Sequence, residues 1–204
     1  MEPMQAARPF AVLSNHFESC EAVNPETRET ASALSEALRS LGELAVDAQA
    51  VILNKPAELW LEAHENGASE SDPAIQALQQ LETCRIGTCQ GIIFDVNSLQ
   101  VSVSQLDRLG GEDGARRSQS LVEPTLNTIR DDLALLHFCT IARAGMLCAE
   151  DNIDACLDVL REYAAFLGQT IIPNADLLER LAVDGNAWKN LGEAATAFAG
   201  AIAR

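Results

Sequence analysis

The hydrophobic residues between positions 31 and 52 follow a repeat of three and four positions. The repeat consists of Ala31, Leu34, Leu38, Leu41, Ala45, Ala48 and Ile52. This spacing places all of these side chains on one stripe of an α-helix. Ala37, Leu44 and Val51 lie beside the stripe, which widens the apolar face to that of a helix packed inside a globular bundle. We therefore expect one long helix over about residues 25–53, starting after Asn24.

A second stretch of helical periodicity begins at Glu123-Pro124. Between Leu133 and Cys148 nearly every residue is apolar. A helix that is apolar on all sides has to be buried. The pattern predicts a second long helix over about 123–148, packed against the first one at the centre of the molecule.

Shorter helices are predicted between and after these two. Their apolar spacing and Pro, Asn or Gly boundaries indicate helices over about 57–65, 75–84, 152–167, 176–183 and 187–202. Gly87 and Gly91 bracket a predicted break after the helix over 75–84. The expected fold class is all-α, a multi-helix bundle with two long central helices and several shorter ones.

Residues 92–103 fit two different structures. Ile92, Val96 and Leu99 keep helical spacing, whereas Leu99, Val101 and Val103 alternate with polar residues as in a half-buried strand. We favour the helix, and a small β-hairpin over 92–103 is the alternative.

The chain is expected to form a single helical domain over 24–204. Residues 1–23 mix polar residues and proline with scattered apolar side chains, which is typical of a loosely ordered tail. Residues 110–120 contain glycines, acids and an arginine pair, and predict a flexible internal linker.

The chain carries 30 acidic residues against 14 basic ones, a net charge of −16. This charge disfavours direct binding to nucleic acid or to anionic membranes. No N-terminal signal pattern is apparent, and the longest weakly charged stretch is too short to cross a bilayer. We expect a soluble, cytoplasmic protein. Its arginine-rich, lysine-poor composition is typical of a bacterial genome rich in G and C.

No sequence motif predicts catalysis, a metal or a cofactor. The six cysteines are expected to be reduced and mostly buried. Cys84 and Cys89 are spaced poorly for a shared metal ion. The chain has no phosphate-binding glycine loop, no zinc-protease motif and no nucleophile-elbow sequence.

One residue of the apolar stretch 133–148 suggests a ligand. Arg143 needs an acid or an anion there, because an unpaired buried charge is costly. A carboxylate from a neighbouring helix would satisfy it. A pocket for an anionic small molecule around Arg143, His137 and Cys139 is the alternative.

The leading hypothesis is a non-enzymatic interaction or regulatory protein that forms a homodimer and acts through protein–protein contacts. The last helix presents Trp188, Leu191, Phe198 and Ile202 on one side, which suits a symmetric dimer interface. The same face would serve equally well to complete the monomer core. An anionic-ligand binder or enzyme is the second hypothesis, and an acidic mimic of nucleic acid that binds a basic partner is the third.

Overall fold

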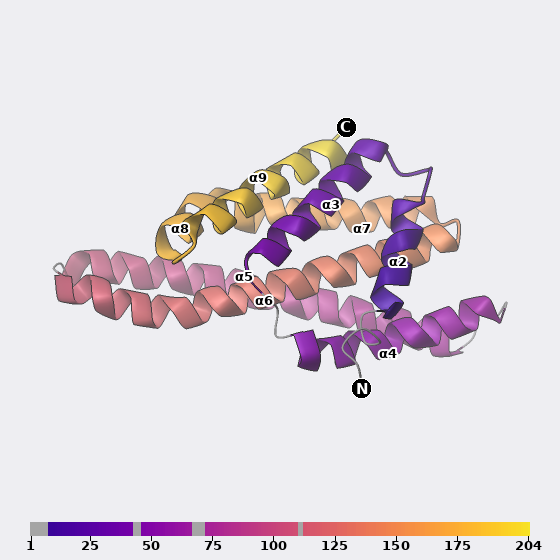
Figure 1. The fold of residues 1–204 in the computed structure, drawn as a ribbon, viewed down its shortest axis with the longest axis horizontal. Coiled ribbons are helices and arrows are strands. Elements are labelled where there is room, and N and C mark those ends of the chain that lie inside the picture. Colours follow the sequence, from indigo (N-terminus) through magenta and orange to yellow (C-terminus); the bar gives the residue numbers. More distant parts are fainter. Residues whose placement is uncertain (1–7, 43–45, 67–71, 110–111) are drawn as a thin grey trace.

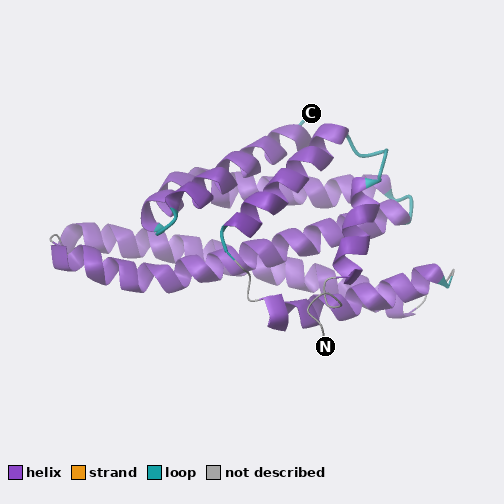
Figure 2. Cartoon of the chain, in the orientation of Figure 1, coloured by secondary structure: helices purple, strands orange, loops and turns teal. Residues whose placement is uncertain are grey.

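The computed structural model describes residues 8–42, 46–66, 72–109 and 112–204. Every regular element in these residues is helical (Figure 2), which confirms the all-α, multi-helix fold class. Along the chain the elements are α2 (Arg8–Glu18), α3 (Pro25–Ser40), α4 (Val46–Glu65), α5 (Asp72–Leu109), α6 (Glu112–Ala149), α7 (Ile153–Phe166), a π-helical turn (Leu167–Ile171), a 3-10 turn (Ile172–Asn174), α8 (Ala175–Leu181) and α9 (Gly185–Ile202).

Helices α5 and α6 form a long hairpin through the middle of the molecule (Figure 1). Each contains 38 residues, and one end of the hairpin extends beyond the other helices (Figure 1). The predicted helix over 123–148 lies within α6. Residues 112–120, expected as part of a linker, form the start of α6, and residues 110 and 111 lie outside the described residues.

Helix α6 is buried from two sides. One hydrophobic core lies between α6 and helices α3, α5, α7 and α9, and includes Leu34, Leu133 and Phe198. A second core lies between α6 and helices α2, α4 and α5, and includes Trp60 and Met146. The prediction of a central buried helix is confirmed.

The stretch Val122–Ala149 is the part of the described chain that is long and apolar enough to cross a membrane, and an 18-residue window within it has a mean hydropathy of 1.4. Inside the fold, 72% of this window is buried. Most of the window therefore packs against the two cores around α6.

The predicted single helix over 25–53 is wrong. Helix α3 ends at Ser40, and Gly42 has a φ of +136°, a conformation that glycine adopts at low cost. The first part of the apolar repeat, up to Leu38, is buried as predicted. The repeat continues into α4 because two successive amphipathic helices carry the same periodicity, and Ala45 lies outside the described residues.

Helix α5 runs without the break expected at Gly87 and Gly91, and residues 92–103 are helical, as favoured. A glycine inside a helix costs about 1 kcal/mol relative to alanine. Packing against α6 compensates for this cost. The two long helices at the centre are therefore α5 and α6.

Part of the expected N-terminal tail is an ordered helix, α2, and residues 1–7 lie outside the described residues. Helix α2 crosses α6, and Leu13 and Phe17 are buried at the crossing. The crossing needs a glycine, because a Cβ atom at Gly145 would lie 2.0 Å from the carbonyl oxygen of Leu13. The hydrophobic residues of this segment are thus part of the core.

We predict that Gly145→Ala lowers the free energy of unfolding by at least about 2 kcal/mol, because the added methyl group overpacks the crossing. Chemical denaturation measures the change. Gly200→Ala is the matched control, because a Cβ at Gly200 in α9 meets nothing within 4 Å and alanine favours the helix by about 0.5–1 kcal/mol. Equal stability of the two variants would contradict the close crossing.

Candidate functional site

The structure separates the residues that the sequence indicated as a ligand pocket. His137 is completely buried and faces α3 and α7. Its Nε2 lies 2.5 Å from the Ser35 hydroxyl and its Nδ1 lies 3.3 Å from the Tyr163 hydroxyl. Burial, reinforced by the positive charge of Arg39, lowers the pKa of His137 to about 3. His137 is therefore a neutral core residue with both ring nitrogens occupied.

Cys139 lies in the other core, next to Cys84 of α5. A hydrogen bond between the two thiols, together with burial, raises the pKa of Cys139 well above its ordinary value. The same hydrogen bond, acting against burial, lowers the pKa of Cys84 to about 7. Of this pair, Cys84 therefore has the lower pKa. In the sequence it could be compared only with Cys89, because contacts between α5 and α6 leave no sequence signal.

Arg143 is partly buried among charged residues of its own chain. Burial lowers its pKa, and the carboxylates of Glu82 and Glu150 oppose that effect. Its Nη1 atom is buried and has no hydrogen-bond partner among the described residues. Glu82 and Glu150 thus partly offset the charge of Arg143, but among the described residues neither forms an ion pair with it, and the positive charge of Arg85 acts on it as well.

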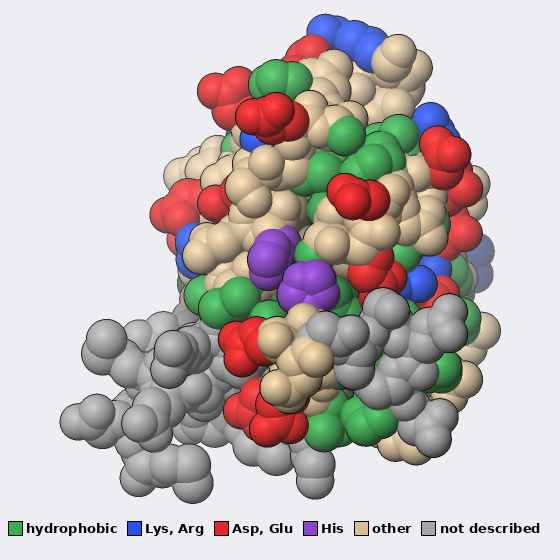
Figure 3. Space-filling model, turned by 90° about the vertical axis from the view of Figure 1, so that its right-hand side faces the viewer, with side chains coloured by type: hydrophobic (Ala, Val, Ile, Leu, Met, Phe, Trp, Pro, Cys, Tyr) green, Lys and Arg blue, Asp and Glu red, His purple; other side chains and the backbone are tan. Residues whose placement is uncertain are grey.

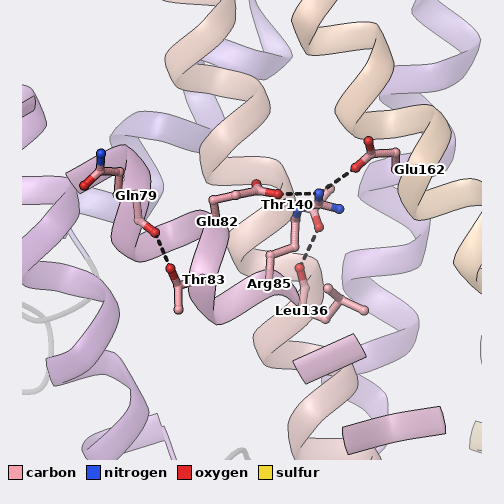
Figure 4. Close-up of polar contacts among 7 residues, drawn as sticks. All are labelled: Gln79, Glu82, Thr83, Arg85, Leu136, Thr140 and Glu162. Carbon is pink, nitrogen blue, oxygen red and sulfur yellow. Dashed lines mark hydrogen bonds and ion pairs between the residues drawn. The ribbon is translucent and has the colours of Figure 1, made fainter. Parts of the chain in front are cut away.

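A second arginine, which was not singled out from the sequence, is buried and forms ion pairs with two carboxylates that are partly or largely exposed. Arg85 of α5 is only 8% exposed and donates to both carboxylate oxygens of Glu82, at 3.1 and 2.7 Å, and to Glu162 of α7 at 2.5 Å (Figure 4). The two carboxylates raise the pKa of Arg85, and the hydrogen bonds from Arg85 lower the pKa of Glu82. The pair joins α5 to α7, which is a structural role.

Two histidines lie together at one end of the molecule (Figure 3). The ring centroids of His16 and His64 are 6.1 Å apart, and His64 stacks on Trp60 at 4.8 Å. The Trp60 indole donates a hydrogen bond of 3.2 Å to Glu150. Among the described residues, no group of three His, Cys, Asp or Glu side chains is placed to hold a metal ion, and the cluster ties α2 to α4.

The face of α9 predicted to form a dimer interface is covered by the chain's own helices. Trp188, Leu191 and Phe198 are buried in the core between α3, α7 and α9, and Ile202 packs partly against it. The Phe198 ring lies 5.6 Å from Tyr163. The residues therefore complete the monomer core, which was the other interpretation of this helix.

An uncharged exposed face runs along α5. Between residues 73 and 105, all of which the structure describes, every exposed residue on this helix is uncharged. These residues are Pro73, Ile75, Gln76, Gln79, Gln80, Thr83, Ile86, Gly87, Gln90, Ile93, Phe94, Asn97, Gln100, Val101, Ser104 and Gln105. We call this set the α5 face. It is notable in a chain whose net charge is −16.

The α5 face also carries most of the exposed large hydrophobic residues in the described part of the chain. Those on α5 are Ile75, Ile86, Ile93, Phe94 and Val101. The remaining exposed large hydrophobic residue of the described chain is Val183. At about 100° per residue, the five on α5 fall within an arc of roughly 100°. Phe94, at 71%, is the most exposed of the five. These five side chains form an interrupted apolar stripe along α5, with exposed Gln, Thr and Asn residues between them, and such a gathering of exposed apolar residues is a candidate interaction site.

The sequence analysis missed this surface for two reasons. It assigned a break at Gly87 and Gly91, which divided the stripe. It also used hydrophobic periodicity to find the buried side of each helix. Because α5 has apolar residues on both sides, the periodicity alone does not show which side faces α6. The low charge of the segment was the available signal.

We predict that His137 makes the protein less stable in acid. The unfolded chain binds a proton at this residue near pH 6.5, whereas the folded chain does so only near pH 3. The stability that neutral His137 contributes is therefore fully present above pH 6.5. As the pH falls toward 3, the free energy of unfolding decreases by about 1.4 kcal/mol per pH unit. Denaturation between pH 7 and 4 should show a steeper loss for the wild type than for His137→Gln. Parallel curves would contradict a neutral buried histidine.

The chain was compared with protein-family models, with curated proteins and with solved structures, and none of the three comparisons found a match. Its function therefore has to be argued from its own surfaces and side chains. Of these, the α5 face is the strongest candidate for an interaction site.

Proposed function

We propose that the protein is a non-enzymatic helical interaction protein that self-associates through the α5 face. The observation that carries the proposal is the absence of charged residues from the exposed positions of 73–105 in a chain of net charge −16. Two copies of so acidic a protein repel each other over most of their surfaces. The α5 face lets them meet without bringing acidic side chains together.

The spacing along the α5 face suits a helix pair. Gln79, Thr83, Ile86, Gln90, Ile93, Asn97, Gln100 and Ser104 are exposed and alternate at four and three positions. This is the spacing at which two helices interlock along a shared seam. Ile86 and Ile93 supply apolar contact, while Gln90 and Asn97 supply paired amides that fix the register at a cost in stability.

The size of the face predicts a weak dimer. Residues 73–105 extend over about 48 Å at 1.5 Å per residue, and a helix is about 10 Å wide. Contact along this length buries roughly 500 Å² on each copy, below the ~800 Å² per partner of a standard interface. We therefore expect reversible association in the micromolar range between two copies related by a two-fold axis.

Other features favour binding to a protein over binding to a small molecule. His137 and Cys139 are enclosed in the core, and Arg143 lies close to acidic residues. The six cysteines are free thiols, which is consistent with the cytoplasmic location included in this proposal.

We predict that Phe94→Glu weakens self-association at least tenfold. It places an acidic side chain from each copy inside the same uncharged interface, and the loss of a well-packed aromatic contact adds to the cost. Analytical ultracentrifugation of the wild type should show reversible formation of a species of twice the 21.9 kDa chain mass. The variant should remain at the mass of one chain at the same concentration.

Val183→Glu is the matched control, because Val183 is 78% exposed and lies outside the α5 face. It should associate like the wild type. Added salt should strengthen the wild-type dimer, because it screens the repulsion between acidic surfaces. A wild type that remains monomeric at 100 micromolar, or a Val183→Glu variant as defective as Phe94→Glu, would refute the proposal.

A further inference from the structure

Three cysteines from separate helices meet where α2, α6 and α7 converge. Cys148 lies at the end of α6, Cys156 in the first turns of α7, and Cys20 just after α2. The Sγ atoms of Cys148 and Cys156 are 3.4 Å apart, and the Cys20 thiol lies near enough to Cys148 for each to affect the pKa of the other. We call these residues the thiol cluster. None of them was singled out from the sequence as a site.

The accessibility of the three thiols changes in order across the cluster. Cys20 is partly exposed, Cys148 is 9% exposed and Cys156 is completely buried. The cluster therefore connects the surface to the core through a row of three sulfur atoms. A buried cysteine on its own acts as a small hydrophobic side chain. Three neighbouring cysteines can also exchange disulfide bonds with one another.

The geometry and the charges favour a bond between Cys148 and Cys156. A disulfide has an S–S distance of about 2.05 Å, so the two sulfur atoms need to approach by only roughly 1.4 Å. The hydrogen bond from Cys148 lowers the pKa of Cys156, and the positive charge of Arg143 assists against the effect of burial. Cys156 is therefore the better nucleophile of the pair.

We propose that Cys148 and Cys156 form a reversible disulfide, and that a peroxide oxidises them through Cys20. Burial and the neighbouring Cys148 thiol raise the pKa of Cys20, so its thiolate is a minor form; this thiolate attacks hydrogen peroxide, the O–O bond breaks, and Cys20 becomes a sulfenic acid while water leaves. Cys148 attacks that sulfur, which forms a Cys20–Cys148 disulfide and releases a second water. The Cys156 thiolate then attacks the Cys148 sulfur, and Cys20 leaves as a thiolate. In sum, two thiols lose two electrons and one peroxide is reduced to two waters.

The disulfide joins the end of α6 to the start of α7 across a short turn. Closing this loop restricts the unfolded chain, so the oxidised protein should melt about 5 °C above the reduced one. A dithiol reductant reverses the bond by thiol–disulfide exchange. The inference does not depend on self-association through the α5 face.

The test uses the reduced full-length protein and hydrogen peroxide. After acid quenching, free thiols are labelled with N-ethylmaleimide in guanidinium, and the protein is digested with trypsin. Cys148 and Cys156 fall in one tryptic peptide, residues 144–161, while the other cysteines fall in four different peptides. We expect this peptide to become unlabelled and lighter by two hydrogen atoms, and to regain both labels after treatment with dithiothreitol.

Two variants separate the disulfide from the route to it. Cys20→Ser should slow the loss of label from peptide 144–161 by at least about tenfold, because the two remaining thiols of the cluster, Cys148 and Cys156, are buried. Cys89→Ser is the control, since Cys89 is a partly buried cysteine of α5, and it should leave the rate unchanged. An unchanged rate in Cys20→Ser would overturn the role of Cys20.

The disulfide itself is overturned by either of two results. In the first result, peptide 144–161 retains both labels while other cysteines are oxidised. In the second, the first cross-link to form joins the peptides 40–85 and 131–143, which contain Cys84 and Cys139. The melting temperature gives a second readout. Equal melting of the oxidised and reduced proteins would show that no bond restricts the α6–α7 turn.

Discussion

The burial of α6 between two cores is the constraint on which the rest of the structure depends. Over residues 133–148 α6 is covered on nearly all sides, so the buried polar side chains of this part need partners within the chain. His137 lies between two hydroxyl groups, and the Thr140 hydroxyl donates to the carbonyl of Leu136 at 2.7 Å (Figure 4). Arg143 lies near two carboxylates. Two of the polar residues in this stretch, His137 and Thr140, are thus satisfied within the core, whereas Arg143 keeps one buried nitrogen without a hydrogen bond among the described residues.

The same constraint explains why α5 is unusual. Helix α5 covers one side of α6, and its charged residues within 73–105 are Glu82, Arg85 and Asp95. None of the three is fully exposed, and Arg85 forms the ion pairs that reach α7. Within 73–105 the charged residues of α5 thus lie at buried or partly buried positions and uncharged residues occupy the exposed ones, the reverse of an ordinary surface helix. Depletion of charge is typical of the centre of a protein–protein interface.

Much of the fold could be predicted from the sequence, because burial leaves a periodic signal. The core stretch 133–148 and the helix starting after Asn152 were both predicted, and the Asn152 side chain caps α7 as such a residue should. The turn at Gly42 was missed because the apolar repeat continued across it. Gly87 and Gly91 were given too much weight, since tertiary packing outweighs the helix propensity of single glycines.

The candidate sites were harder to predict, for a physical reason. Periodicity shows that a helix face needs an apolar partner, but it does not show whether that partner is the same chain or a second copy. The α9 face containing Trp188 and Phe198 proved to be covered by its own chain, whereas the α5 face did not. Contacts between side chains distant in sequence, such as Cys84 with Cys139, follow only from the way the helices pack.

The thiol cluster illustrates how one backbone contact sets up another feature. Helix α2 approaches α6 closely because residue 145 has no side chain. Cys148 lies three residues after Gly145 in α6. Cys20 lies three residues after Phe17, which is buried at the same crossing. The position of Cys20 beside Cys148 is therefore a consequence of the Gly145 crossing. A shift of α2 large enough to accommodate a methyl group at residue 145 would also move Cys20 relative to Cys148, while Cys156, held by α7, would keep its place.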